Sequence, residues 1–140
     1  MRLHRESEYG LRALVHLAKQ PPDRIIPLSE IAAAQKLPQS FLAKIFQKFV
    51  QHSLLKSYRG VERGYTLAKS PKEITLREVL EAIEGPGLFE QCLFWNNRCA
   101  DTNPCLLHEE WKKIKPGLIE MVEQTTLEDI AREPRDRARK

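Results

Sequence analysis

The segment from Gln39 to His52 most constrains how this chain can fold, because its residues separate into two faces at helical spacing. One face is apolar and aromatic enough to build a core, and it consists of Phe41, Leu42, Ile45, Phe46, Phe49 and Val50. The opposite face is neutral to basic, and it consists of Gln39, Ser40, Ala43, Lys44, Gln47, Lys48 and Gln51. Such a helix packs one side inside the protein and leaves the other side for a partner.

The neighbouring segments predict a particular order of elements around this helix. Apolar residues at helical spacing predict a first helix over residues 6–19, and the prolines of QPPDRIIP end it. The alanine-rich run LSEIAAAQKL predicts a second helix, which LPQS separates from the third. The runs LLKSY and YTLA flank RGVERG and predict a β-hairpin. Helix, helix, short turn, helix and hairpin is the order of a winged helix-turn-helix.

The net charge of +4 is distributed unevenly along the chain. Residues 1–72 carry 13 Lys and Arg against 5 Asp and Glu, whereas residues 73–133 carry 6 against 13. A basic first half predicts contact with a polyanion, and together with the order of elements it predicts binding to double-stranded DNA. The alternative is a three-helix domain that binds protein and leaves its basic face solvated.

The predicted DNA contacts come from the third helix and from the hairpin. The N-terminal half of the helix carries the side chains expected to read base edges in the major groove, namely Gln39, Ser40 and Lys44. The hairpin tip is expected to reach a minor groove or phosphates through Arg59 and Arg63. Further phosphate contacts are expected from Arg2, Arg5 and Lys56.

The second half of the chain predicts helices with another role. Thr75 and Glu78 have the spacing of a capping box, which predicts a helix over TLREVLEAIEG that Gly85 closes. Thr126 and Asp129 have the same spacing and predict a short last helix. A long helix is predicted from about Cys105, and its heptad-like seam consists of Leu107, Trp111, Ile114, Leu118 and Met121. We therefore expect a mainly α protein with a small β-hairpin wing and a long C-terminal dimerisation helix. Its DNA-binding region spans 1–72, and its cysteine-containing loop and dimerisation helices span 73–140.

All three cysteines and one histidine lie within 17 residues, in the pattern Cys92-x6-Cys99-x5-Cys105-x2-His108. Thiolate and imidazole ligands suit zinc or an iron–sulfur cluster. Three thiols are an odd number for a disulfide framework, and the N-terminus has no apolar signal region, so a cytoplasmic protein is expected. Three alternatives stay open: a zinc-stabilised DNA- or RNA-binding module without sensing, a thiol-based redox switch, and three unrelated thiols in a loop.

Two classes of function are not supported by the residue patterns. The chain has no nucleophile–base arrangement and no glycine-rich loop of the phosphate-binding kind, so an enzyme is not expected. It also has no run of 18 apolar residues, so a membrane span is not expected.

Several motifs occur in a specific order: MRL at the start, PLSEIA, SFLAKIF, the hairpin ending in GY, the three cysteines, CLLHEEW and TTLEDIA. In this order the chain resembles the iron–sulfur winged helix-turn-helix transcriptional regulators of the IscR/NsrR type, over nearly its whole length. The resemblance implies a cytoplasmic homodimer that binds a palindromic operator, in most cases as a repressor. It also implies that the protein senses redox state, nitric oxide or iron status through a cluster.

The resemblance further implies a ligand set in which Cys92, Cys99 and Cys105 hold the cluster. In the IscR-like case His108 is the fourth ligand and the cluster is [2Fe–2S]. In the NsrR-like case Glu8 of the partner subunit takes that place and the cluster is [4Fe–4S]. The gap of two residues between Cys105 and His108 favours the histidine and the smaller cluster.

Overall fold

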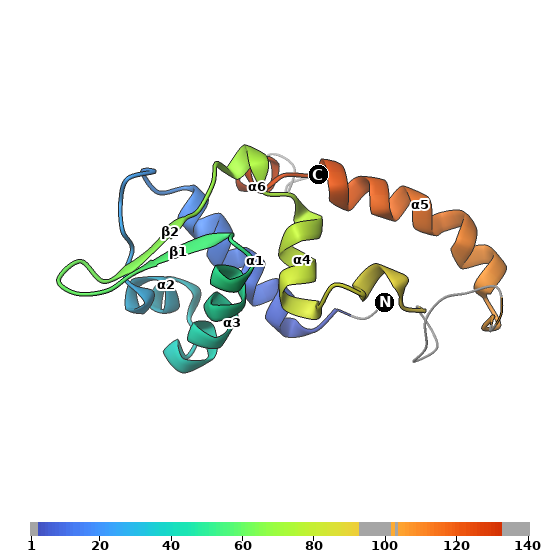
Figure 1. Cartoon of the computed structure of the whole chain (residues 1–140), viewed down its shortest axis with the longest axis horizontal. Helices are drawn as coiled ribbons and strands as arrows, with labels where there is room; N and C mark the ends of the chain where they lie inside the picture. The colour runs from blue at the N-terminus through green and yellow to red at the C-terminus, as the bar shows by residue number, and fades with distance from the viewer. Residues whose placement is uncertain (1–2, 93–101, 103, 133–140) are drawn as a thin grey trace.

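The computed structural model describes residues 3–92, 102 and 104–132, and within them the chain is mainly helical with one two-stranded antiparallel hairpin. The predicted fold class is thereby confirmed. In Figure 1 the hairpin lies at one end of the molecule and the long α5 at the other, with α4 between them. The elements are α1 (Arg5–Ala18), α2 (Leu28–Gln35), α3 (Gln39–Gln51), β1 (Leu55–Tyr58), β2 (Gly64–Leu67), η1 (Pro71–Glu73), α4 (Leu76–Glu84), η2 (Leu88–Glu90), α5 (His108–Gln124) and α6 (Leu127–Ala131).

Proline and a left-handed residue set the boundaries of the helix-turn-helix. Pro27 directly precedes α2 and Pro38 directly precedes α3, and both have extended backbone angles. Between them Lys36 takes the left-handed conformation at φ 56°, which ends α2 and turns the chain. Only three residues therefore separate the two helices, as the sequence predicts.

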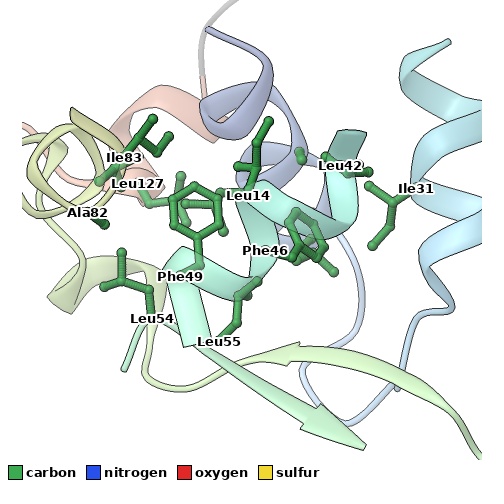
Figure 2. Packing of buried hydrophobic residues seen from close by; sticks show 14 of the residues in the cluster. Leu14, Ile31, Leu42, Phe46, Phe49, Leu54, Leu55, Ala82, Ile83 and Leu127 are labelled. Atoms are coloured by element: carbon green, nitrogen blue, oxygen red, sulfur yellow. The ribbon is translucent and has the colours of Figure 1, made fainter. Parts of the chain in front are cut away.

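The main core is centred on the apolar face of α3. Leu42, Ile45, Phe46 and Phe49 are each at most 1% exposed, and Figure 2 shows the two phenylalanines surrounded by side chains from other elements. Gly10 of α1 lies so close to this face that an added Cβ would come within 3.0 Å of its side chains. The core also includes Ile74, Val79, Ala82, Ile83 and Leu127, which follow position 72 in the chain. The division at that position therefore stays a prediction.

The hairpin is tied to the segment before α2. Leu55 pairs with Leu67 and Tyr58 with Gly64, and Ile26 forms an isolated bridge with Tyr65. The backbone N–H of Ile26 donates to the carbonyl of Tyr65 at 3.0 Å, and the N–H of Tyr65 donates back at 2.9 Å. At Gly64 an added Cβ would come within 2.4 Å of the Ile26 carbonyl oxygen, so this close approach requires glycine. The hairpin is thus held in place beside α2.

The helices of the second half begin at their predicted caps, with one difference. Capping boxes are present at Thr75 with Glu78 and at Thr126 with Asp129. The long helix α5 begins at His108, three residues after the predicted start, because Cys105 lies in a turn closed by the His108 N–H donating to its carbonyl at 3.1 Å. A smaller buried cluster joins α4, η2 and α5, and consists of Leu80, Leu88, Phe89 and Val122.

Candidate nucleic-acid interface and cysteine site

An open groove of about 590 Å³ lies where the first turn of α2, the first residue of α3 and the hairpin meet. It contains three predicted DNA contacts, Gln39, Arg59 and Arg63, which the bridge between Ile26 and Tyr65 helps to bring together. The groove is also lined by Pro27, Leu28, Ser29, Ser57, Tyr58, Gly64 and Tyr65. Side chains from three separate elements therefore share one concave surface.

The cations on this side of the molecule have no acidic partners within the described part of the chain. There Lys44, Lys56, Arg59 and Arg63 are exposed and make no ion pair. Several other cations are neutralised, as in the pairs of Lys69 with Glu78 at 2.7 Å and of Arg77 with Glu123 at 2.8 Å. The positive charge around the groove is thus available to an anionic partner.

The remaining predicted contacts lie in different places. Ser40 and Lys44 are exposed on α3, and Lys56 is exposed on β1, but none of the three lines the groove. Arg2 lies outside the described residues. On the hairpin loop Val61 is fully exposed, and Gly60 takes φ 95°. The groove and the exposed polar side of α3 together make the candidate interface.

Sequence reasoning missed the groove residues contributed by α2 and β1. Among the described residues, the backbone N–H groups of Leu28 and Ser29 have no backbone acceptor, as expected for the first turn of a helix. These N–H groups and the helix dipole favour an anion at this end of α2. The proline directly before LSE was the available signal, because it marks a helix start. Nothing local indicated that Tyr58 would face the same space.

Two of the three cysteines approach each other. Cys92 follows η2 and Cys105 precedes α5, and both side chains are buried. A hydrogen bond between the two thiols raises the pKa of Cys105, and desolvation raises it further, against the opposing effect of backbone hydrogen bonds at Leu107 and Cys105. The contact brings together thiols that are separated by 12 residues. Cys99 lies outside the described residues.

The candidate fourth ligands have different surroundings. His108 is the first residue of α5 and its side chain is buried, whereas Glu8 of α1 is 64% exposed and pairs with Arg12 at 3.8 Å. Within the described residues, no group of three His, Cys, Asp or Glu side chains is close enough to hold a metal ion. The buried thiol pair matches the soft ligands that iron and zinc accept. The described part of the chain therefore contributes two thiols to the candidate metal site.

The seam of α5 divides between two environments. Trp111 is buried, and Leu118 packs against the small cluster of its own chain. Leu107, Ile114 and Met121 are 42%, 61% and 52% exposed. These three recur every seven residues, so they form one apolar stripe along the outer side of the helix. Among the described residues, no helix is both long and apolar enough to cross a membrane.

Comparison with known proteins gives one consistent family. A model named Rrf2 and described as an iron-dependent transcriptional regulator matches residues 3–133. The regulator CymR of Bacillus subtilis is 30% identical over 131 residues, which are 94% of this chain and 90% of CymR. The regulator IscR of Pectobacterium carotovorum is 26% identical over 130 residues, covering 93% of this chain and 79% of IscR.

A solved structure agrees with this result. The structure of CymR, described as the global cysteine regulator of B. subtilis, superposes with a TM-score of 0.78 at 27% identity. The superposition covers 94% of this chain and 96% of CymR. These relatives are transcriptional regulators and not enzymes. The chain belongs to the Rrf2 family of transcriptional regulators.

Proposed function

We propose that this protein is a homodimeric, cluster-sensing repressor that binds a palindromic operator. The observation that carries its DNA-binding part is the groove shared by α2, α3 and the hairpin, where Gln39 lies with Arg59 and Arg63. In this proposal Gln39, Ser40 and Lys44 read base edges in the major groove. The cations Arg2, Lys56, Arg59 and Arg63 contact phosphates or the minor groove.

The dimer in this proposal forms through α5. A second copy of the chain would cover the stripe of Leu107, Ile114 and Met121, which is apolar and exposed in the single chain. An interface of this kind places two copies of α3 about a two-fold axis. Half-sites about one helical turn apart, roughly 34 Å, are then read together. A small change in the angle between the two copies weakens the fit to DNA.

The sensing part of the proposal is an iron–sulfur cluster held by Cys92, Cys99, Cys105 and His108. Support comes from the iron-dependent description of the family and from the contact between the Cys92 and Cys105 thiols. When bound, such a cluster supplies iron–thiolate chemistry that responds to oxidants and to nitric oxide. The histidine favours [2Fe–2S], and Glu8 of a partner copy with [4Fe–4S] is the alternative. Zinc at the same thiols is the non-sensing alternative.

A second candidate function is a thiol switch, and the hydrogen bond between the Cys92 and Cys105 thiols favours it. In this case the two thiols reduce one hydroperoxide molecule. They lose two protons and two electrons, an S–S bond forms, the peroxide O–O bond breaks, and water and an alcohol (or a second water) leave. The buried setting of both sulfurs slows this reaction, because the peroxide must reach a sulfur that the folded protein covers.

An absorption spectrum of protein purified without oxygen, with iron and sulfide counts, separates these candidates. We expect a coloured protein with two irons and two sulfides per chain, as [2Fe–2S] requires. Colourless protein that contains zinc would mean that the thiols hold a structural zinc ion and not an iron–sulfur cluster. Colourless, metal-free protein that forms a Cys92–Cys105 disulfide with peroxide would establish the thiol switch instead.

Substitutions then identify the ligands. Cys92→Ala, Cys99→Ala and Cys105→Ala should each remove the visible absorption and leave a folded dimer by circular dichroism and sedimentation. A variant that retained full iron would remove its cysteine from the ligand set. His108→Ala should lose or destabilise the cluster while Glu8→Ala keeps it. The opposite result with four irons per chain would favour the carboxylate of a partner copy.

A further inference from the structure

The C-terminal end of α4 is held by α1 through one carboxylate. The Glu84 side chain is 4% exposed and accepts hydrogen bonds from the backbone N–H of His4 and from Ser7 Oγ, both at 2.6 Å. Its other oxygen lies 2.6 Å from His4 Nδ1. The N-cap residue of α1, His4, makes no side-chain cap of its own. Glu84, 80 positions later in the chain, therefore accepts the backbone N–H of His4 that has no partner within α1.

The same end of α4 is held by the recognition helix α3. Lys48 Nζ donates to the carbonyl oxygen of Ile83 at 3.3 Å and to Glu6 Oε2, also at 3.3 Å. The Ile83 carbonyl lies in the last turn of α4, where carbonyls have no partner within the helix and where the dipole favours a cation. Lys48 thus joins α3 to the ends of α4 and α1 with one side chain.

The segment that follows this end leads directly to the cysteine site. Gly85 closes α4 at φ 105°, and η2 carries the chain on to Cys92, seven residues further along. Leu88 and Phe89 of η2 are buried in the small cluster, so the segment is packed and transmits displacement. A change at Cys92 therefore acts on the helix end that Glu84 and Lys48 attach to α1 and α3.

We infer that Glu84 and Lys48 are positioning residues. Through them, the binding or loss of the cluster at the cysteines changes the position of α3, the helix proposed to read the DNA bases. This inference rests on the proposed function, since it concerns regulation of the same DNA-binding surface. Coupling between two sites requires an element whose position both sites bias. The end of α4 is such an element, because residues 85–92 leave it on one side and α3 is attached on the other.

Lys44 provides the matched control on the same helix. It lies one turn before Lys48, is exposed, and makes no ion pair within the described residues. A lysine that only contacts DNA should affect the DNA affinity equally in the cluster-loaded and the cluster-free protein. A positioning lysine should affect the ratio of the two affinities.

The experiment measures binding by fluorescence anisotropy to a duplex selected with this protein from a random-sequence pool. Cluster-loaded and cluster-free forms of the full chain are compared for the wild type, Glu84→Gln, Lys48→Met, Lys48→Arg and Lys44→Met. The wild-type ratio should lie within roughly 5- to 150-fold. Glu84→Gln and Lys48→Met should bring it toward one, Lys48→Arg should restore it, and Lys44→Met should weaken both forms equally. Wild-type ratios in both Glu84→Gln and Lys48→Met would overturn the inference.

Two further measurements keep this test separate from the proposed function. Iron and sulfide counts of each variant must equal those of the wild type, so that a lost ratio reports lost transmission and not lost cluster. If the wild type binds no iron, the cluster proposal fails, and the same ratio is measured between reduced and peroxide-oxidised protein.

Hydrogen exchange of cluster-free protein tests the two contacts directly. Exchange should rise at the first turn of α1 in Glu84→Gln and at the last turn of α3 in Lys48→Met. Unchanged exchange in both variants would mean that Glu84 and Lys48 do not hold α1 and α3 to the end of α4.

Discussion

The hairpin end and the α5 end of the molecule in Figure 1 differ in the kind of surface that they expose and in the size of the buried core beneath it. Within the described residues, the hairpin end presents cations that make no ion pair and a polar groove, and beneath it a core of seventeen buried apolar residues joins α1 to α4 and α6. The α5 end presents an apolar stripe, and beneath it the described residues form a smaller cluster of four buried apolar side chains. The first surface is basic and suited to a polyanion. The second is apolar and requires another apolar surface to complete its burial.

The largest expected effect comes from weakening the core behind the hairpin end. Phe46 is fully buried and packs edge-on against Tyr65 at a centroid distance of 4.9 Å. Phe46→Ala should lower the free energy of unfolding by about 3–5 kcal/mol, as measured by urea denaturation. Leu88→Ala should cost nearer to about 2 kcal/mol, because the buried cluster that contains Leu88 is smaller and the truncated site can collapse more easily. A larger loss for Leu88→Ala would reverse the comparison.

A second change should affect the α5 end alone. Ile114→Glu would place a carboxylate within the proposed dimer interface, where burying an unpaired charge costs several kcal/mol. Sedimentation should show a dimer dissociation constant at least roughly a hundredfold higher, or about 3 kcal/mol. Lys113→Glu is the control at an exposed neighbouring position and should remain a dimer. Two equally dimeric variants would mean that the stripe is not the interface.

A third change should affect the hairpin end alone. Gln39→Ala should reduce discrimination between operator and random DNA by about 1–3 kcal/mol, because Gln39 lies in the groove. Arg59→Ala should weaken binding to both and reduce the slope of log affinity against log salt by about 0.9, since one phosphate contact is lost. Titrations at several salt concentrations separate the two effects. Identical losses on both duplexes for both variants would contradict the proposed orientation of α3.

The smallest expected effect concerns Glu84, which links the C-terminal end of α4 to α1. Burial alone raises the pKa of Glu84, but hydrogen bonds from Ser7 and His4 outweigh it, so the pKa lies below the ordinary glutamate value. A carboxylate with a lowered folded-state pKa stabilises the fold above its unfolded pKa, and this stability is lost as pH falls through the folded pKa. Glu84→Gln should therefore cost about 1 kcal/mol at neutral pH.

The cost of Glu84→Gln should shrink in the acid range below about pH 4.3, where the wild-type carboxyl also becomes protonated. Urea denaturation of both proteins across this range checks the direction. Arg77→Gln provides a comparison, because its guanidinium, in the first turn of α4, contacts Glu81, Glu123 and the Phe89 ring. A cost for Glu84→Gln that grows with acidity would contradict the assigned pKa direction.

Local signals in the sequence determined most of the fold. The two faces of the segment from Gln39 to His52, the prolines before α2 and α3, and the capping boxes at Thr75 and Thr126 each correspond to a feature of the structure. All of these signals depend on interactions within about one helical turn, or on the backbone preferences of single residues. Such interactions are available before distant segments meet, so the sequence alone indicates them.

Other features were decided only by the tertiary structure. The spacing of the α5 seam does not distinguish Trp111, which faces its own chain, from Ile114, which faces outward. The cap that Glu84 provides for α1, and the presence of Tyr58 beside Gln39, likewise join residues that no local pattern connects. These contacts depend on how whole helices pack, because a side chain's partner across the fold is set by the positions of many other residues.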